Sequence, residues 1–476
     1  MPRRPPRHTR LQAAPAPPAP SRLGVASLWV LVLTLPFVFV PDAKDAFRLP
    51  QLMVAEGLGL ASLLAFSVRL RAAGVVDPWR QAALWAVLPL VLAAVTSAAA
   101  SDHPQHSGEA LADLGIGAAC LVGWSVALPA AGLRRLLDGL VVPASLVAVL
   151  GILQFHGLYR PFLFTGGEEA ARVGIASTLG NAADLGAFLV LPCLLCQLGL
   201  RRSAGGRRLL WGAGLAVCLY ALAATQTLSA LAALLVSSLV LWGLGLPARR
   251  LVAAAALIAL AAAGLGLGIA PLRERLAAKA SQLVAGDLNE LLSGRLDGWR
   301  AAGWMLAEEP WWGVGHGAFV AEFARAKLAL LEAGVPFYRG HVHAMFSHAH
   351  NELLQVAAEM GLLGFAALAW GGAVLGRALA ALARGAGGRR APPPRSARNA
   401  GADRARRKDR GGALDRALPA GDADRDRALA LAGVTGYGVL ALAHFPFHIP
   451  AVAYPALLFL AWLFAAAARA APWGEA

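Results

Sequence analysis

The sequence contains few charged residues. Only 15% of its 476 residues are Asp, Glu, Lys or Arg, and 58% are hydrophobic. Soluble globular chains have about 45–50% apolar residues. The shortage of charge therefore excludes an ordinary water-soluble protein and indicates that lipid is the main solvent of this chain.

Cysteines and internal repeats are also scarce. The four cysteines, Cys120, Cys193, Cys196 and Cys218, all lie inside apolar runs, which favours buried packing over a metal or redox role for the CxxC pair. No solenoid-type repeat is found. The apolar run 23–40 is too long for a signal-peptide core and lacks a small-residue cleavage site, so we expect it to remain as the first helix.

Long apolar runs recur along the whole chain. Each is long enough to cross a hydrocarbon core of about 30 Å, and backbone groups in lipid must bond internally, which requires helices. We therefore predict an all-α, polytopic transmembrane bundle of about 12 helices. The predicted helices are 23–40, 50–68, 81–100, 111–131, 136–156, 181–200, 209–226, 228–247, 251–270, 353–376, 428–445 and 450–468.

The formal charge of +15 would suggest nucleic acid in a soluble protein. The basic residues, however, gather in alternate loops. With the N-terminus in the cytoplasm, 31 of the 43 lysines and arginines fall on the cytoplasmic side, as the positive-inside rule requires. The charge therefore indicates membrane topology, and no nucleic-acid partner is expected.

The same topology divides the chain into segments. We expect a basic cytoplasmic tail, nine helices, a folded periplasmic loop, the tenth helix, a flexible cytoplasmic linker without apolar periodicity, and the last two helices with a C-terminal tail. These segments are 1–22, 23–270, 271–350, 351–383, 384–427 and 428–476.

Two helices are predicted inside the periplasmic loop. Residues Arg295 to Glu308 have Leu296, Trp299, Gly303 and Leu306 on one face, and Pro310 stops the helix. A glycine-rich turn, PWWGVGHG, follows. The stretch from Phe319 to Glu332 is amphipathic as well, and we expect its apolar side chains, Phe319, Phe323, Leu330 and Leu331, to pack on the membrane surface or on the bundle.

Four histidines, His341, His343, His348 and His350, lie within ten residues, HVHAMFSHAH, before the tenth helix. Three interpretations compete: a metal site, a general base with polar neighbours, or interfacial histidines without a role. HxH spacing suits a metal, but no cysteines or clustered carboxylates complete a ligand set.

The tenth helix begins with polar residues. Glu352, Gln355 and Glu359 follow at spacings of three and four, so they share one face, and Asn351 lies beside that stripe. Polar groups at the end of a membrane helix normally face a cavity or a partner. Glu352 is also compatible with a place in the headgroup region, whereas Glu359 lies deeper.

Arginines outside the cytoplasm are few. Arg172 precedes the sixth helix, Arg295 opens the loop helix and Arg48 enters the second helix. A guanidinium binds phosphate oxygens in a planar, bidentate way and stays charged. A solvated or headgroup contact is the simpler interpretation of Arg48, Arg325 and Arg339.

The loop and the tenth helix resemble a known family. The stretch SGRLDGWRAAGWMLAEEPWWGVGHGAF and the later HAHNELLQVAAEMGLLG are similar to the O-antigen ligase and polymerase superfamily, with its pattern of Arg, Trp, PxxGxG and HNxxLQxxxExGxxG. The resemblance is strong over 293–365. Weaker similarity extends to DAKDAFRLPQ at 42–51, RVGIASTLGN at 172–181 and HFPFHIP at 444–450.

The resemblance implies a GT-C-like transferase in the bacterial inner membrane with its active site facing the periplasm. It would move a glycan from an undecaprenyl diphosphate carrier to lipid A-core or a similar acceptor, without a metal or other cofactor and with inversion. His350 takes the place of the family's catalytic histidine, and Glu359 supports it. Arg172 and Arg295 take the places of diphosphate ligands, and we add Asn351, His348 and Arg48 as substrate-binding candidates.

The sequence also departs from the family pattern. It has GNAAD at 180–184 where relatives often have GNPN, and Leu228 occupies an arginine's place in TQTLSA at 225–230. An O-antigen polymerase and a protein O-oligosaccharyltransferase share the motifs and remain alternatives, as does a membrane transporter, although neither inverted repeats nor broken helices are evident. A non-catalytic scaffold for envelope assembly is the third class, favoured only by these departures.

Overall fold

The computed structural model describes residues 19–41, 43, 45–72, 81–159, 175–244, 264, 268–338, 340, 345–387 and 420–470. Within these residues the fold is helical and contains no strand. The bundle consists of α1 (Arg22–Thr34), α2 (Arg48–Ala72), α3 (Ala82–Ala99), α4 (Pro104–Ala127), α5 (Ala130–Gly139), α6 (Val141–Phe155), α8 (Ala182–Arg202), α9 (Gly206–Ala224), α10 (Leu228–Gly243), α16 (Glu352–Gly387), α18 (Ala420–Ala443) and α19 (Pro450–Ala470).

The all-helical prediction is confirmed for these residues, but the count of about twelve spans is not. Eight helical stretches in the described part of the chain are long and apolar enough to cross a membrane, and α5 and α6 together form one of them. The first predicted span is shorter than expected, because α1 gives way at Thr34 to a single 3-10 turn, Leu35–Phe37, that contains Pro36. The helix α10 is also short, and most of the predicted ninth helix, 251–270, lies outside the described residues.

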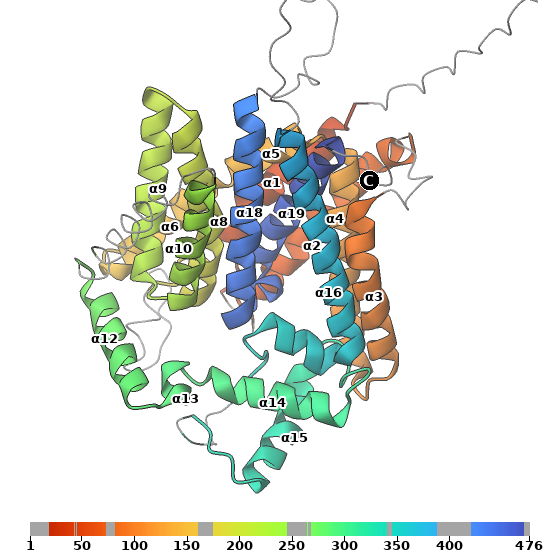
Figure 1. The fold of residues 1–476 in the computed structure, drawn as a ribbon, viewed down its shortest axis with the longest axis vertical. Helices are drawn as coiled ribbons and strands as arrows, with labels where there is room; N and C mark the ends of the chain where they lie inside the picture. The colour runs from red at the N-terminus through yellow and green to blue at the C-terminus, as the bar shows by residue number, and fades with distance from the viewer. Residues whose placement is uncertain are drawn as a thin grey trace, which may run out of the picture.

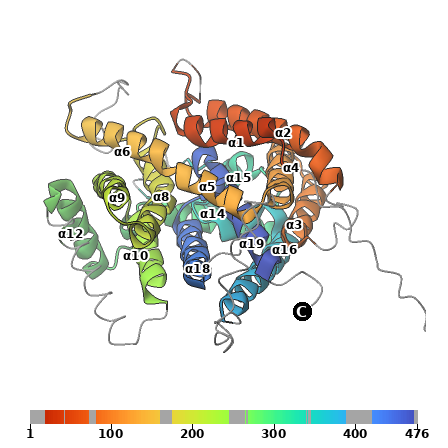
Figure 2. The same cartoon turned by 90° about the horizontal axis from the view of Figure 1, so that it is seen from above.

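The long helices stand side by side, with α8 and α19 at the centre (Figures 1 and 2). Along their apolar stretches, 89% of the residues of α8 and 78% of those of α19 are buried. A helix that is hydrophobic all round belongs inside a bundle. All four cysteines are free and buried, as predicted, and Cys193 and Cys196 lie on α8 itself.

A second, smaller core forms at one end of the bundle. The helices α12 (Ala270–Val284), α13 (Leu288–Leu291), α14 (Arg295–Glu308) and α15 (Phe319–Glu332) lie below the upright helices in Figure 1. Both predicted loop helices are confirmed with the expected bounds. Phe319 and Phe323 pack with Met305 of α14 and Ala358 of α16 in a cluster separate from the main core. They therefore pack on the bundle, one of the two expected places, through the start of α16.

The most buried face of α14 is not the face of Leu296, Trp299, Gly303 and Leu306 identified in the sequence. Its buried residues are Asp297, Gly298, Ala301, Ala302 and Met305, whereas Gly303 is exposed. The small side chains face inward because α14 packs closely on the segment before α16: a Cβ on Gly298 would lie 3.2 Å from the Ala349 carbonyl oxygen. Hydrophobicity alone does not reveal such a close approach.

The two helices that flank the predicted linker extend further into it than expected. The helix α16 continues to Gly387 and α18 begins at Ala420, so both ends of the predicted 384–427 linker are helical. The remainder, 388–419, lies outside the described residues. The start of α16 contacts the end of α18 through Asn351 and the Leu442 carbonyl. The two helices are therefore antiparallel, and both linker ends lie at the far end of the bundle.

Ion pairs join several helices at that far end. Arg134 of α5 bonds Asp138 on its own helix at 3.1 Å and Asp426 of α18 at 3.3 Å, and Arg202 at the end of α8 bonds Asp138 at 3.0 Å. Arg134 also lies over the Trp462 ring. Among the described residues, the last turns of α2, α8 and α16 contain arginines. These arginines lie at the end of the bundle opposite the loop helices.

Candidate active site

Four histidine rings surround one phenylalanine at the loop end of the bundle. The ring centroids of His348, His350 and His444 each lie 4.7 Å from that of Phe445, and His448 lies 6.4 Å away. His348 and His448 are only 4.4 Å apart. The rings come from two segments, the residues before α16 and residues 444–448 between α18 and α19, of which Pro446–His448 form a 3-10 turn. Folding therefore makes one cluster from two histidine motifs.

Arg48 connects this cluster to two further helices. Its guanidinium, at the start of α2, lies 5.0 Å from the centroid of the Phe445 ring and bonds Asp184 of α8 at 3.0 Å. The other Asp184 oxygen is 3.5 Å from His444 Nε2. Asp184 occupies the third position of α8, where the helix N-terminus favours a carboxylate, and it is buried. The simple headgroup interpretation of Arg48 is therefore wrong.

Positive charge and burial together keep His350 neutral. The pKa of His350 is lowered to about 3; burial is the largest cause, and the charge of Arg295, the first residue of α14, is the next largest. His444 and Arg48 act in the same direction, and Asp184 opposes them. Burial likewise lowers the pKa of His348 to about 2, with His448 next in effect. Neutral imidazole is the form that accepts a proton.

The backbone at His350 is unusual. Its φ of +55° lies in the left-handed region, which costs a non-glycine residue about 1–2 kcal/mol. Asn351 caps the following helix, because its Oδ1 accepts hydrogen bonds from the N–H groups of Leu353 and Leu354. Such strain persists where the surroundings fix it, and it clusters at functional sites. Nδ1 of His350 is buried and has no hydrogen-bond partner among the described residues.

The polar stripe of α16 is confirmed, because Glu352, Gln355 and Glu359 are all buried. Glu352 accepts a hydrogen bond from the Phe447 N–H at 3.1 Å and lies 3.4 Å from His448 Nδ1. Burial alone would lower the pKa of His448, but this carboxylate reverses the effect and raises it. A headgroup role for Glu352 is therefore excluded by its burial and partners.

Glu359 lies further along the helix and does not touch His350 directly. Its carboxylate is 3.3 Å from His316 Nδ1 and accepts a 2.7 Å hydrogen bond from the Gln355 amide. The Gln355 carbonyl oxygen in turn accepts the Ala349 N–H at 2.6 Å. Glu359 is therefore linked to the histidine segment through Gln355.

The glycine-rich turn fits against a break in α16. Gly361 has φ +61° and ψ −158°, which is not helical, and a break leaves backbone groups that need partners. The turn supplies them: the Val314 and Gly315 N–H groups bond the carbonyls of Ala358 and Glu359, and the Pro310 carbonyl accepts the Leu362 N–H. A Cβ on Gly361 would lie 2.5 Å from the Trp311 carbonyl. The turn therefore supplies hydrogen-bond partners for the backbone at the break, and the break leaves room for the turn.

The structure brings together most of the predicted site residues. Arg48, His348, His350 and Asn351 lie at the same end of the bundle, and Arg295 acts electrostatically on His350. Arg172, and the metal candidates His341 and His343, lie outside the described residues. The residues that sequence reasoning missed are Asp184, His316, His444, Phe445 and His448. All five lie in motifs already quoted, but their partners are distant in sequence.

These residues come from the segments whose patterns resemble one family. Residues 213–369 match the family model described as O-Antigen ligase. The match confirms the resemblance predicted from the sequence, and it covers about a third of the chain. No curated protein matches the chain. The family and the apolar helices indicate a multi-pass membrane protein with glycan transfer of the O-antigen ligase or polymerase type.

The O-antigen ligase match contains only part of the histidine cluster. It runs from α9 to α16 and includes Arg295, His316, His350 and Glu359, whereas Arg48, Asp184, His444 and His448 lie outside it. Leu228, which replaces the family's arginine, packs with Ile269 and Leu272 in an apolar cluster. This departure is therefore accommodated by local packing.

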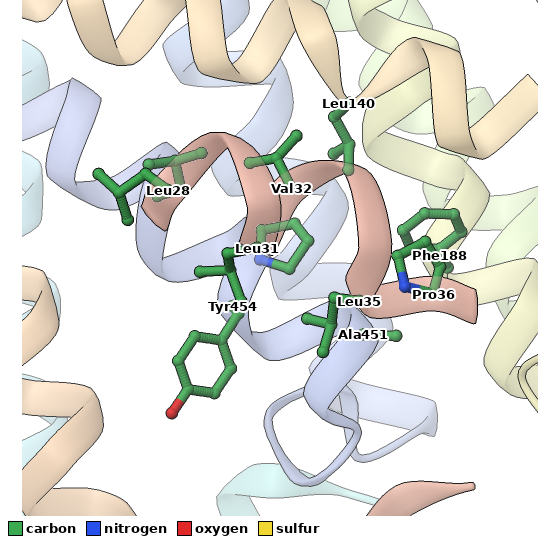
Figure 3. Close-up of a pocket in the computed structure, with 11 residues that line it drawn as sticks. Leu28, Leu31, Val32, Leu35, Pro36, Leu140, Phe188, Ala451 and Tyr454 are labelled. Carbon is green, nitrogen blue, oxygen red and sulfur yellow. The ribbon is translucent and has the colours of Figure 1, made fainter. Parts of the chain in front are cut away.

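A pocket between α1, α8 and α19 has a different character (Figure 3). Its lining is apolar and includes Leu31, Pro36 and Phe188. These side chains offer no positive charge to a diphosphate. The candidate active site is therefore the histidine cluster around Phe445.

Proposed function

We propose that the protein transfers a glycan from undecaprenyl diphosphate to a hydroxyl of lipid A-core or a similar acceptor, at the periplasmic face of the bacterial inner membrane. The observation that carries the proposal is the convergence of neutral His350 with the charges of Arg48 and Arg295. A hydroxyl nucleophile requires a neutral base, and a leaving diphosphate requires positive charge.

In the proposed step, the acceptor oxygen forms a bond to the anomeric carbon as the bond from that carbon to the diphosphate oxygen breaks. The hydroxyl proton passes to His350, and undecaprenyl diphosphate leaves with the electron pair of the broken bond. Attack from the face opposite the leaving group inverts the anomeric configuration. The arginines offset the growing negative charge, so the step is written without a metal.

Donor binding would also adjust the base. In the free protein Arg295 and Arg48 lower the pKa of His350. A bound diphosphate brings negative charge that opposes both guanidinium groups, and an opposite charge within a few ångström favours protonated imidazole. The basicity of His350 therefore increases when the donor is in place. Ligation, polymerisation and transfer to protein can share this step, because they differ only in the acceptor hydroxyl.

The arrangement of charge supports the side of the membrane on which we place the site. Arginines at the ends of α2, α8 and α16 lie opposite the histidine end, and clustered basic residues favour the cytoplasm. This supports a periplasmic histidine cluster. A membrane transporter gains no comparable support, because its substrate site would lie near the bilayer midplane between repeats.

The test is the variant His350→Ala, expressed in the native host without the chromosomal copy. Transfer should be lost, so the lipopolysaccharide ladder or other envelope glycan should disappear while the protein still inserts at wild-type level. His156→Ala, which changes an exposed histidine bonded to Tyr220, is the matched control and should leave the glycan unchanged. A wild-type glycan profile in His350→Ala would refute the proposal.

A further inference from the structure

Ala349, the residue before His350, is held by a chain of polar contacts that begins 33 positions earlier, at His316. His316 Nδ1 lies 3.3 Å from Glu359, the Glu359 carboxylate accepts the Gln355 N–H at 2.7 Å, and Gln355 accepts the Ala349 N–H at 2.6 Å. Only 2% of Gln355 and 4% of Glu359 are exposed. Water therefore cannot substitute for a lost partner in this chain.

We propose that Gln355 is a positioning residue that fixes His350 through the Ala349 N–H, and that Glu359 and His316 set the orientation of its amide. The inference rests on the proposed role of His350 as the base. It gives Gln355 and Glu359, the second and third residues of the polar stripe of α16, a role in positioning His350, although neither contacts the His350 ring.

The chemistry of Glu359 permits only one orientation of the amide. An ionised carboxylate only accepts hydrogen bonds, so the Gln355 NH₂ group must face Glu359. The carbonyl oxygen then faces the Ala349 N–H, as observed. Rotation of the amide by 180° would place an oxygen against the carboxylate and an NH₂ group against an N–H, and both contacts are repulsive.

Ala349 also relates His350 to Arg295 through its carbonyl group. The Ala349 carbonyl oxygen lies against Gly298, where an added Cβ would be 3.2 Å away, and Arg295 lies on the same helix one turn earlier. Gln355 holds the N–H of Ala349, and α14 packs on its carbonyl. Movement of this residue would therefore change the separation between the base and the arginine.

The left-handed backbone of His350 shows why such a restraint is needed. A residue at φ +55° relaxes to a common conformation unless its neighbours prevent it. Asn351 restrains the chain on one side by capping α16 and by donating to the Leu442 carbonyl. Gln355 restrains it on the other side. Relaxation would turn the imidazole away from the arginines, and a displacement of about 1 Å can lower a rate on the order of 100-fold.

The test compares three variants in purified full-length protein in vesicles, with an undecaprenyl-diphosphate-linked glycan from the native host as donor and its lipopolysaccharide core as acceptor. Gln355→Leu should lower kcat by about 10- to 100-fold and leave KM for the donor within about twofold, because the arginines are intact. Gln197→Leu is the matched control: this buried glutamine of α8 bonds Ser238 and Trp242, remote from His350, and it should keep the wild-type kcat even if its melting temperature falls.

Gln355→Glu gives a signature that a general loss of stability does not. At low pH the new carboxyl group shares a proton with Glu359, so it donates to Glu359 and accepts the Ala349 N–H as the amide did. As the pH rises, this proton is lost and the two carboxylates repel each other. The transfer rate of Gln355→Glu should therefore fall at alkaline pH, whereas that of the wild type should not. This pH dependence also tests the proposal if Gln355→Leu does not fold.

Wild-type kcat in Gln355→Leu, or a wild-type pH profile in Gln355→Glu, would overturn the positioning role. His350→Ala in the same assay separates this failure from failure of the proposed function. If His350→Ala is inactive while Gln355→Leu is fully active, only the positioning inference is wrong. If His350→Ala is fully active, the base assignment itself is wrong.

Discussion

The guanidinium of Arg48 donates a 3.0 Å hydrogen bond to the carboxylate of Asp184, across 136 positions of sequence. Asp184 belongs to the GNAAD turn, one of the places where the sequence departs from the O-antigen ligase pattern. The Asp184 carboxylate, directly after the altered residues, places a negative charge beside an arginine of the candidate site. It reduces the net positive charge that a diphosphate would meet.

Removing that charge should strengthen diphosphate binding. Asp184→Asn keeps an oxygen that accepts from Arg48 but eliminates the carboxylate charge. We expect undecaprenyl diphosphate to bind about tenfold more tightly, the equivalent of ~1.4 kcal/mol, as measured by calorimetry in detergent. Asp138→Asn, at the far end of the bundle, is the control and should leave the affinity unchanged. Weaker binding in Asp184→Asn would contradict the assignment of Arg48 to the donor.

Arg295 should determine the pH at which the transfer rate begins to fall on acidification, the acid limb of the pH–rate profile. Its charge lowers the pKa of His350, so Arg295→Met should raise that pKa from about 3 toward the ordinary 6.5. Protonated His350 cannot accept a proton, and the residual rate should therefore begin to fall at a higher pH than in the wild type. Arg300→Met, which changes an arginine on the same helix bonded to the Pro336 carbonyl, should not move the limb. An unmoved limb in Arg295→Met would show that Arg295 does not act on His350.

The partly buried His348 and His350 should make the protein sensitive to acid. The pKa values of His348 and His350 are lowered to about 2 and about 3, so between pH 6.5 and 3 the unfolded chain binds protons that the folded chain does not. Stability should fall with pH by about 1.4 kcal/mol per pH unit for each histidine. In detergent, the melting temperature of His348→Phe should fall less steeply than that of the wild type. His156→Phe, at an exposed position, should retain the wild-type slope, and equal slopes for all three proteins would count against the burial effect.

The break in α16 should depend on Gly361. A Cβ there would meet the Trp311 carbonyl at 2.5 Å, and the glycine-type backbone of Gly361, φ +61° and ψ −158°, costs an alanine about 1–3 kcal/mol in addition. Gly361→Ala should therefore lower the melting temperature and the yield of folded protein. Gly376→Ala lies on the same helix with nothing within 4 Å of the added Cβ, so it should be neutral or stabilising. Equal stability of the two variants would show that the turn does not need the break.

The topology can be tested with single cysteines, because all four native cysteines are buried. Ser347→Cys, at an exposed position three residues before His350, should react in intact spheroplasts with a maleimide that cannot cross the membrane. Arg208→Cys, exposed at the start of α9, should react only after lysis. The reverse pattern would place the histidine cluster in the cytoplasm and remove the basis for periplasmic transfer.

Several features follow from the sequence because they depend on neighbours along the chain. The bounds of α14 and α15 follow from local periodicity and from Pro310, and the stripe of Glu352, Gln355 and Glu359 follows from the geometry of one helix. The family motif identified His350 and Arg295. Apolar length predicted membrane helices, but it did not fix their number, because α1 and α10 end earlier than their apolar runs.

The tertiary structure alone determined which residues meet. Three contacts join segments that are tens to hundreds of residues apart. Phe445 packs against four histidines, Asp184 pairs with Arg48, and His316 lies beside Glu359. The buried face of α14 differs from its apolar face for the same reason, because a close helix contact selects small side chains over large apolar ones. Periodicity reports which face of a helix is apolar, whereas the partner of a polar side chain is decided by packing between distant segments.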